Sequence, residues 1–312
     1  MKKVCSFAVA VLFVASLAQA TLVREKFLTD PVADGWKVYG VTNLFQWNAD
    51  AHVLNVTWDS SQTNSYYYLP LDRTYTKADG FFVQFDLNLT DTAAVGYFQV
   101  AAGLCNFSNA TSATFSRSTG VSPNLFEFDY FPDGPNSYGP SIDASMVDQS
   151  NQFYFAFDDS QPMANETTYH VELIHWPGTS AIVGCVYTNG QPFTKFPRVD
   201  NYGANDFKLD TLAIFNYTTT DDPYGDSLLA HGTISNIAFA SPLPIGLVQP
   251  SAAAKVQFGS DTNWLYTLQQ STDLVNWSAA TPATPGNGTN LVLQANNPPA
   301  DHAAYRVDAT LP

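Results

Sequence analysis

The 312-residue chain is poor in basic residues. It has 13 lysines and arginines against 28 aspartates and glutamates, and its formal net charge at pH 7 is -15. A surface of this sign repels phosphate backbones and anionic lipid, which argues against nucleic acid and membrane surfaces as partners. Neutral sugars and divalent cations remain compatible ligands, although acidity that only keeps the protein soluble explains the charge as well.

Cysteine is scarce too, with three residues in the chain and no Cys/His cluster of the zinc-binding type. Cys5 lies in an N-terminal apolar run, which leaves Cys105 and Cys185 as a candidate disulfide if the protein is exported. The alternative is two free thiols in the interior, because a chain of this length can bury a large core without a disulfide.

Long hydrophobic runs are limited to one, Val4–Leu17. Lys2 and Lys3 precede it and Ala18-Gln-Ala20 follows it, which is the pattern of a signal peptide and its cleavage site. The run is short for a membrane span, and the sequence offers no other candidate. We therefore expect residues 1–20 to be a signal peptide and the protein to be secreted to the periplasm, the exterior or the cell surface.

Convincing helical periodicity is missing as well, and strand-like runs dominate. The runs are rich in Val, Ile, Phe, Tyr and Thr, and clusters of Gly, Pro, Asn, Asp and Ser separate them. This pattern predicts an all-β fold, an antiparallel jelly-roll β-sandwich, with helix confined to short turns. The predicted strands are Leu54–Trp58, Ser65–Leu69, Gly80–Leu89, Tyr97–Gly103, Leu125–Phe131, Gln152–Phe157, Tyr169–Trp176, Ala181–Thr188, Thr211–Tyr217 and Thr233–Phe239.

A stretch with three prolines near residues 241–250 predicts a linker. The expected domains are the large sandwich at 21–242, a linker at 243–253 and a smaller β-sandwich at 254–312. The strands predicted for the small domain are Lys255–Phe258, Leu265–Gln270, Leu291–Gln294 and Ala304–Asp308.

The predicted strand Leu125–Phe131 contains most of the candidate functional side chains. Aromatic residues and carboxylates alternate along it, so Glu127 and Asp129 face one side of the sheet, about 7 Å apart at the backbone. The aromatic residues expected on the opposite, core face are Phe126, Phe128 and Tyr130. The two carboxylates can share a cation, act as a catalytic pair, or be ordinary polar positions.

The segment Glu127-Phe-Asp129-Tyr-Phe131-Pro-Asp133 resembles the E-F-D-T-F-x-N strand of legume lectins, a branch of the concanavalin A-like superfamily. The resemblance implies that Asp129 bridges two metal ions and that Glu127 serves a transition metal. It also implies that the Phe131 carbonyl and the Asp133 side chain bind calcium. The downstream histidine of that pattern is missing here, so Ca²⁺ alone is the expected ion.

The same strand resembles the E-x-D-x-E pattern of glycoside hydrolase family 16, which implies Glu127 as nucleophile and Asp129 as its partner. The position of the acid/base falls on Phe131 or Pro132, and neither can transfer a proton. Standard catalysis is therefore disfavoured, and no catalytic residue is assigned.

Aromatic faces stack on the apolar faces of sugar rings, which makes Tyr138, Tyr154 and Trp176 candidate ligand-binding residues, although core packing is the commoner role of a single aromatic. Asp222 joins them because it lies in an acidic loop with glycine and proline. Residues 21–242 as a whole resemble secreted bacterial domains of the concanavalin A-like lectin/glucanase type. The small domain resembles C-terminal β-modules of Verrucomicrobia-like secreted proteins, of immunoglobulin or fibronectin-III character.

We therefore expect a secreted, non-catalytic, lectin-like protein that binds a glycan or polysaccharide, with calcium as a candidate cofactor. Two alternatives stay open. One is a divergent glycoside hydrolase with Glu127 as nucleophile, and the other is a structural or adhesive surface module. The sequence gives no indication of the oligomeric state.

Overall fold

The computed structural model describes residues 21–133, 139–159, 161–175, 181–195, 199–200, 205–241, 255–260, 262, 264–271, 277–295 and 304–310. The predicted signal peptide and linker lie outside the described residues. Within the described parts of the chain, no helix is long and apolar enough to cross a membrane.

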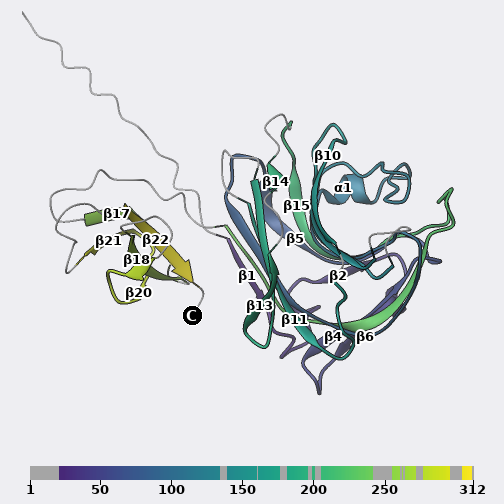
Figure 1. The fold of residues 1–312 in the computed structure, drawn as a ribbon, viewed down its shortest axis with the longest axis horizontal. Coiled ribbons are helices and arrows are strands. Elements are labelled where there is room, and N and C mark those ends of the chain that lie inside the picture. The colour runs from purple at the N-terminus through teal and green to yellow at the C-terminus, as the bar shows by residue number, and fades with distance from the viewer. Residues whose placement is uncertain are drawn as a thin grey trace, which may run out of the picture.

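Two large antiparallel sheets form the main body, and the prediction of an all-β jelly-roll sandwich is confirmed (Figure 1). The seven-stranded sheet has the order β10-β9-β8-β7-β15-β5-β2, and the path of the nine-stranded sheet is β13-β12-β11-β6-β16-β4-β3, with β1 beside β16 and β14 beside β12. Only two short helices, η1 (Thr42–Leu44) and α1 (Phe107–Ala110), appear in the described residues.

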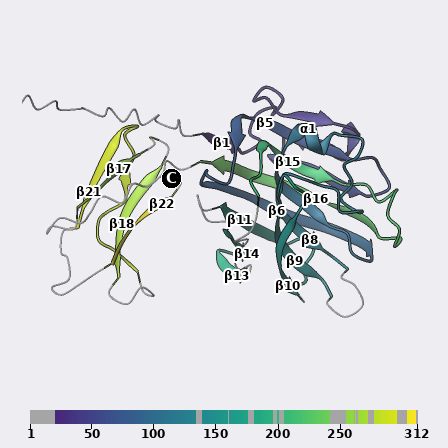
Figure 2. The same ribbon diagram turned by 90° about the horizontal axis from the view of Figure 1, so that it is seen from above.

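The strands of the seven-stranded sheet are β2 (Lys37–Tyr39), β5 (Ser65–Tyr75), β7 (Val100–Cys105), β8 (Leu125–Phe131), β9 (Ser141–Val147), β10 (Phe153–Asp159) and β15 (Leu209–Asn216). Those of the nine-stranded sheet are β1 (Leu22–Glu25), β3 (Phe45–Asn48), β4 (Val53–Asp59), β6 (Phe81–Val95), β11 (Thr168–His175), β12 (Ala181–Thr188), β13 (Gln191–Lys195), β14 (Val199–Asp200) and β16 (Ser227–Ala240). Seen from above, β8, β9 and β10 lie next to one another at one side of the sandwich (Figure 2).

The core lies between the two sheets, and strand β8 shows how it is built. Phe126 packs edge-on against Phe81 of β6, with ring centroids 5.0 Å apart, and Phe128 packs against Phe85 at 5.7 Å. These two β8 rings are fully buried, so each contributes on the order of 2 kcal/mol of hydrophobic stabilisation. Because side chains alternate along a strand, Glu127 then faces away from the core, as predicted.

The C-terminal strands pair with one another and form a second, smaller core. Phe258, Trp264, Tyr266 and Leu268 are buried in it. The strands are β17 (Lys255–Gly259), β18 (Leu265–Ser271), β19 (Ser278–Ala279), β20 (Thr284–Pro285), β21 (Asn290–Gln294) and β22 (Ala304–Thr310). All four strands predicted for this unit are present, with ends shifted by two residues at most.

The candidate disulfide between Cys105 and Cys185 is not formed, and both thiols are free. The physical reason is their placement, since Cys105 lies on β7 of one sheet and Cys185 on β12 of the other. Cys105 is buried, so the alternative of a free thiol in the interior is the correct one for this residue.

Candidate functional site

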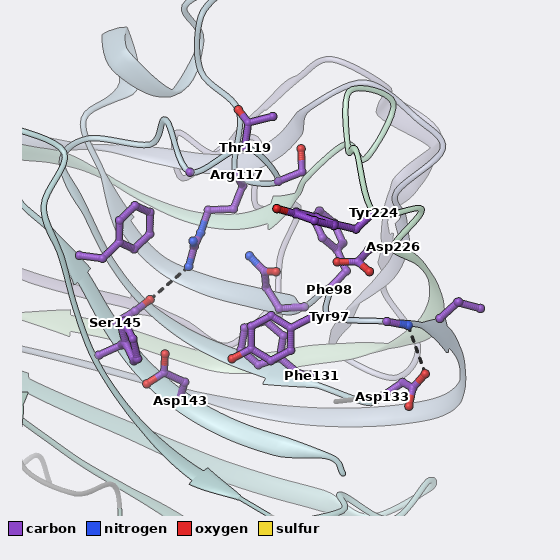
Figure 3. Close-up of a pocket in the computed structure, with 17 residues that line it drawn as sticks. Tyr97, Phe98, Arg117, Thr119, Phe131, Asp133, Asp143, Ser145, Tyr224 and Asp226 are labelled. Carbon is purple, nitrogen blue, oxygen red and sulfur yellow. Dashed lines mark hydrogen bonds between the residues drawn. The ribbon is translucent and has the colours of Figure 1, made fainter. Parts of the chain in front are cut away.

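An open groove of about 1240 Å³ lies on the side of the seven-stranded sheet that faces away from the core (Figure 3). Its floor comes from the neighbouring strands β8, β9 and β10, which contribute Phe131, Asp143, Ser145 and Phe155. The end of β6 and four loops form its walls. The described residues of these segments that line it are Val95, Gly96, Tyr97, Phe98, Gln99, Arg117, Ser118, Thr119, Gly120, Asp133, Tyr224 and Asp226.

Arg117 reaches the floor from the tip of the β7–β8 loop. Ser116 and Val121 exchange two backbone hydrogen bonds of 2.9 and 2.8 Å, which close the four residues between them into a tight turn. Gly120 completes that turn with a φ of 75°, a conformation that glycine adopts without strain. The side chain of Arg117 extends from this turn into the groove (Figure 3).

The Arg117 guanidinium contacts both carboxylates of β8. Its Nε donates to Glu127 Oε1 at 2.8 Å, and its Nη2 lies 3.4 Å from Asp129 Oδ2. Glu127 Oε2 accepts a second hydrogen bond of 2.6 Å from the hydroxyl of Tyr217. Asp129 Oδ2 accepts one of 2.6 Å from Ser145 on β9. The result is a hydrogen-bonded network beneath the groove floor.

Burial governs the electrostatics of this network, because both carboxylates have an exposed fraction of 0%. Burial, and then the charge of Glu127, raises the pKa of Asp129 well above its ordinary value, and Arg117 only partly opposes this. Burial and the same glutamate also raise the pKa of the Tyr217 hydroxyl. The buried environment therefore disfavours the charged form of the Asp129 carboxyl group.

The residues predicted to bind calcium do not fit the ion in this arrangement. A guanidinium already lies against Glu127 and Asp129 and supplies the positive charge that a cation would bring. Asp133 is exposed and accepts a hydrogen bond of 3.2 Å from the Gly96 amide instead. In the described residues, no three acidic, histidine or cysteine side chains are grouped so that they could hold a metal ion.

Glu127 is also badly placed for attack on a substrate. Both of its oxygens accept hydrogen bonds, and Arg117 and Tyr217 cover it. A nucleophile must reach the reacting carbon directly. In this conformation Glu127 cannot do so, because its side chain has no exposed surface.

Aromatic rings give the groove its apolar surfaces. Tyr97 and Phe131 stack with ring centroids 4.1 Å apart and an interplanar angle of 3°. Phe155 is 53% exposed on the floor and Tyr224 is 85% exposed at the rim. Aromatic rings exposed together in one groove offer apolar surfaces on which a ligand can stack. The Arg117 guanidinium also lies over the ring of Phe153, 5.1 Å from its centroid.

The residues that line the groove differ from the ligand-binding residues predicted from the sequence, whose role stays a prediction. Tyr154 points to the other face of β10 and packs against the core, while its neighbours Phe153 and Phe155 line the groove. The strand was predicted, but its exposed face was inverted. Asp222 lies in the correct loop, where it accepts a hydrogen bond of 2.6 Å from the Asp226 amide. Its loop neighbours Tyr224 and Asp226, rather than Asp222 itself, line the groove; Tyr138 and Trp176 lie outside the described residues.

Sequence reasoning missed Arg117, Ser145 and Tyr217. One usable signal is that Arg117 is one of only 13 basic residues in an acidic chain. A lone cation near a pair of buried carboxylates is the expected solution to their charge. Arg117 lies in a loop ten residues before Glu127, and because loops have no periodic pattern, the sequence could not indicate this contact.

The fold is an antiparallel β-sandwich with a groove on one sheet. Comparison with protein-family models finds no match, and comparison with curated proteins finds none either.

Among solved structures, the chain is similar to a legume lectin-like domain from Entamoeba histolytica, with 10% identity, a TM-score of 0.44, and coverage of 70% of this chain and 95% of that one. It is also similar to the carbohydrate recognition domain of Emp47p, with 10% identity, a TM-score of 0.38, and coverage of 69% and 94%. A third structure is a LamA variant from Z. galactanivorans in complex with laminaritriose and laminaritetraose, with 13% identity, a TM-score of 0.39, and coverage of 70% and 98%.

Proposed function

We propose that this chain is a secreted, lectin-like protein that binds a glycan in the groove over the seven-stranded sheet and does not cleave it. One observation carries the proposal, which is the open groove with exposed aromatic rings and polar side chains on the same walls. Sugar rings present apolar C–H faces to aromatic rings and hydroxyl groups to polar side chains, so the lining matches their chemistry.

The state of the two β8 carboxylates supports binding without cleavage. Retaining hydrolysis needs two accessible carboxyl groups about 5–5.5 Å apart across the scissile bond. Here the β8 pair is buried beneath Arg117, and its hydrogen bonds are directed to the protein itself. A pair held in this way rigidifies the groove floor rather than reacting with a ligand.

Secretion and calcium binding, expected from the sequence, remain predictions. Calcium is the weaker of the two, because Arg117 already balances the carboxylates that would bind it. Thermal unfolding with and without a chelator tests calcium, since an ion held only by the folded protein would raise its melting temperature.

Binding to a glycan array tests the proposed function. We expect saturable binding by the wild-type protein, and a loss of about tenfold or more in affinity in Phe155→Ala and Tyr224→Ala, the cost of one good aromatic contact. Both side chains are largely exposed, so their removal leaves the core intact. Leu28→Ala is the matched control, because Leu28 is 62% exposed and does not line the groove. Absence of binding to any plant, algal or bacterial glycan would refute the proposal.

A divergent glycoside hydrolase is the second candidate, and the raised pKa of Asp129 is the observation that favours it. A carboxyl group that keeps its proton near neutral pH is suited to general acid catalysis. Release of reducing sugar by the wild-type protein, abolished in Glu127→Gln, would support this alternative. The third alternative, a structural module with a filled concave face, is less favoured because the groove is open.

A further inference from the structure

We infer that the groove binds an extended glycan segment of about four sugar units, with an aromatic contact at each end of the segment, rather than a single sugar. The inference rests on the proposed function and names the ligand class of the same groove. It depends on the distance between the exposed ring of Phe155 and the stacked rings of Tyr97 and Phe131.

The groove is larger than a single sugar unit requires. Its volume of about 1240 Å³ exceeds the range of about 300–1,000 Å³ that is common for pockets enclosing one small molecule. One sugar unit would leave most of this space filled with water. A longer segment of a sugar chain fills the groove and makes contact along its length.

The strand register determines where the two aromatic surfaces lie. Phe155 of β10 pairs with Ser145 of β9, and Ser145 pairs with Glu127 of β8, so these three residues form one row across the sheet. Phe131 follows Glu127 by two pleats of β8, which is about 13 Å along the strand. Strands β8 and β10 are separated by two strand spacings, or about 10 Å. The Cα atoms of Phe155 and Phe131 are therefore roughly 16 Å apart along a diagonal of the groove floor.

Each end of this diagonal presents an aromatic ring. Phe155 is 53% exposed at one end. At the other end Phe131 is buried, and the half-buried ring of Tyr97, which is stacked on it, gives a ligand its aromatic surface. Figure 3 shows Tyr224 on the same side of Arg117 as Tyr97, so the most exposed ring of the groove belongs to this second end.

Polar side chains accompany the aromatic ones along the diagonal. Ser145 is the cross-strand neighbour of Phe155, and Arg117 extends toward it from the wall. Figure 3 shows this contact on one side of the stacked rings and Asp133 on the other side. A chain that lies across the floor can thus stack at both ends and present its hydroxyl groups to polar side chains in between.

Extended sugar chains match the distance between the rings. A pyranose unit linked through positions 1 and 4 advances the chain by about 5 Å, the reach of about four covalent bonds. The first and fourth units of a β-1,4-linked chain are then about 15 Å apart, close to the length of the diagonal. A disaccharide reaches only one of the two aromatic surfaces. Linkages through neighbouring ring positions bend the chain and advance it less.

Oligosaccharides of increasing length test the inference. Titration calorimetry would compare cello-, xylo- and manno-oligosaccharides, each as the monosaccharide, disaccharide, tetrasaccharide and hexasaccharide. In at least one series we expect the tetrasaccharide to bind about tenfold or more tightly than the disaccharide, the effect of the second aromatic contact. The hexasaccharide should gain no more than about threefold over the tetrasaccharide, because it adds only equivalent positions in the groove.

Variants of the two ends locate the length dependence in the groove. In Phe155→Ala we expect the tetrasaccharide to lose about tenfold in affinity, whereas the disaccharide should lose about twofold at most because the other end still accepts it. Tyr224→Ala should show the same pattern from the opposite end. Both side chains are largely exposed, so the fold is kept. Leu28→Ala is the matched control, and it should leave the affinities unchanged at every length.

The outcomes separate the inference from the proposed function. Equal affinities of the disaccharide and the tetrasaccharide in every series overturn the inference and leave a glycan-binding groove. A loss in Phe155→Ala that is the same at every length also overturns it, as does binding of other glycans on the array when none of the three series binds. Failure to bind any glycan on the array refutes the proposed function and the inference with it.

Discussion

At the scale of single residues, the two carboxylates of β8 have different tasks although they lie two positions apart. Glu127 accepts hydrogen bonds at both oxygens, from Arg117 and from Tyr217. Asp129 uses only Oδ2 as an acceptor, and its Oδ1 is buried without a hydrogen-bond partner. Asp129 therefore has fewer hydrogen bonds to stabilise its charged form than Glu127 has, in keeping with its raised pKa.

This asymmetry predicts opposite responses to amide substitution. Glu127→Gln turns an N–H toward a donor and removes the charge that balances Arg117, so we expect a loss of about 1–3 kcal/mol in the free energy of unfolding. Asp129→Asn can place its amide oxygen where Oδ2 lies, and we expect stability near neutral pH to be equal to or above that of the wild type. Urea unfolding measures both.

The pH dependence provides a further check on Asp129. Its pKa is raised in the folded protein, so the folded state binds its proton more tightly than the unfolded chain does. Its contribution to stability is therefore fully present below the unfolded value of about 4 and declines as the pH rises above it. Asp129→Asn should remove that decline, so its advantage over the wild type should grow with pH. Equal losses in both amide variants would contradict the assignment.

At the scale of strands, β8 was predictable and β9 was not. Bulky aromatic residues alternate with carboxylates along Leu125–Phe131, and the observed strand has the same ends as the predicted one. Strand β9 alternates too, but its residues on the groove side are Ser141, Asp143 and Ser145. Aspartate is uncommon in strands and serine adds no apolar alternation, so no strand was predicted for this half of the groove floor.

The contacts of the site were less predictable than its strands. Arg117, Tyr217 and Tyr224 lie in loops whose positions depend on long-range contacts, such as the 2.9 Å hydrogen bond from Ser118 to Asp221. Periodicity describes which face of an element is buried, but it contains no information on which loop covers that face. The sequence thus identified the strand of the site and missed the side chain that neutralises it.

A cross-strand pair on the nine-stranded sheet also gives a prediction at the scale of strands. His170 of β11 lies opposite Asp86 of β6, with its Nδ1 2.6 Å from the carboxylate. The hydrogen bond to Asp86, and then one to Glu172, raises the pKa of His170 to about 9. The pair therefore stabilises the fold fully below the unfolded pKa of about 6.5, and this stabilisation is lost as the pH rises through about 9.

We expect His170→Gln to lower the free energy of unfolding by about 1 kcal/mol near pH 6 and by almost nothing near pH 10. The value at pH 6 is reduced for solvent screening because the His170 side chain is 33% exposed. Urea unfolding at the two pH values measures the difference. His231→Gln is the matched control, since His231 pairs with Asp91 on neighbouring strands of the same sheet but both side chains are more exposed. A cost that does not change with pH would show that packing, rather than charge, is lost.

At the scale of the whole molecule, the sandwich brings together segments that are far apart in the chain. The groove combines the β6–β7 turn, three neighbouring strands and the β7–β8, β8–β9 and β15–β16 loops, so its lining residues extend from Val95 to Asp226 in the chain. Each of these segments alone is an ordinary turn or strand. The groove exists because the sheet order places β7, β8 and β9 side by side and because β15 pairs with β7. A binding site of this kind follows from topology and cannot be found by a local motif.

The placement of the two cysteines in separate sheets predicts their chemistry in the folded protein. Cys105 is 1% exposed, and burial, together with the nearby Asp210 and Glu127, raises the pKa of its thiol well above the ordinary value. Because the thiolate is the reactive form, Cys105 should resist alkylation until the sandwich unfolds. Cys185 is half-buried on β12 and should react earlier.

Alkylation followed by peptide mass spectrometry, across a urea titration, measures both rates, with Cys185→Ser as the control that isolates Cys105. We expect labelling of Cys105 to follow the global unfolding transition, because its strand lies in the middle of the seven-stranded sheet. A reducing agent should leave the unfolding midpoint unchanged, since no disulfide joins the two sheets. A lower midpoint under reducing conditions, with both thiols protected from alkylation in the oxidised protein, would instead mean that a covalent link stabilises the fold.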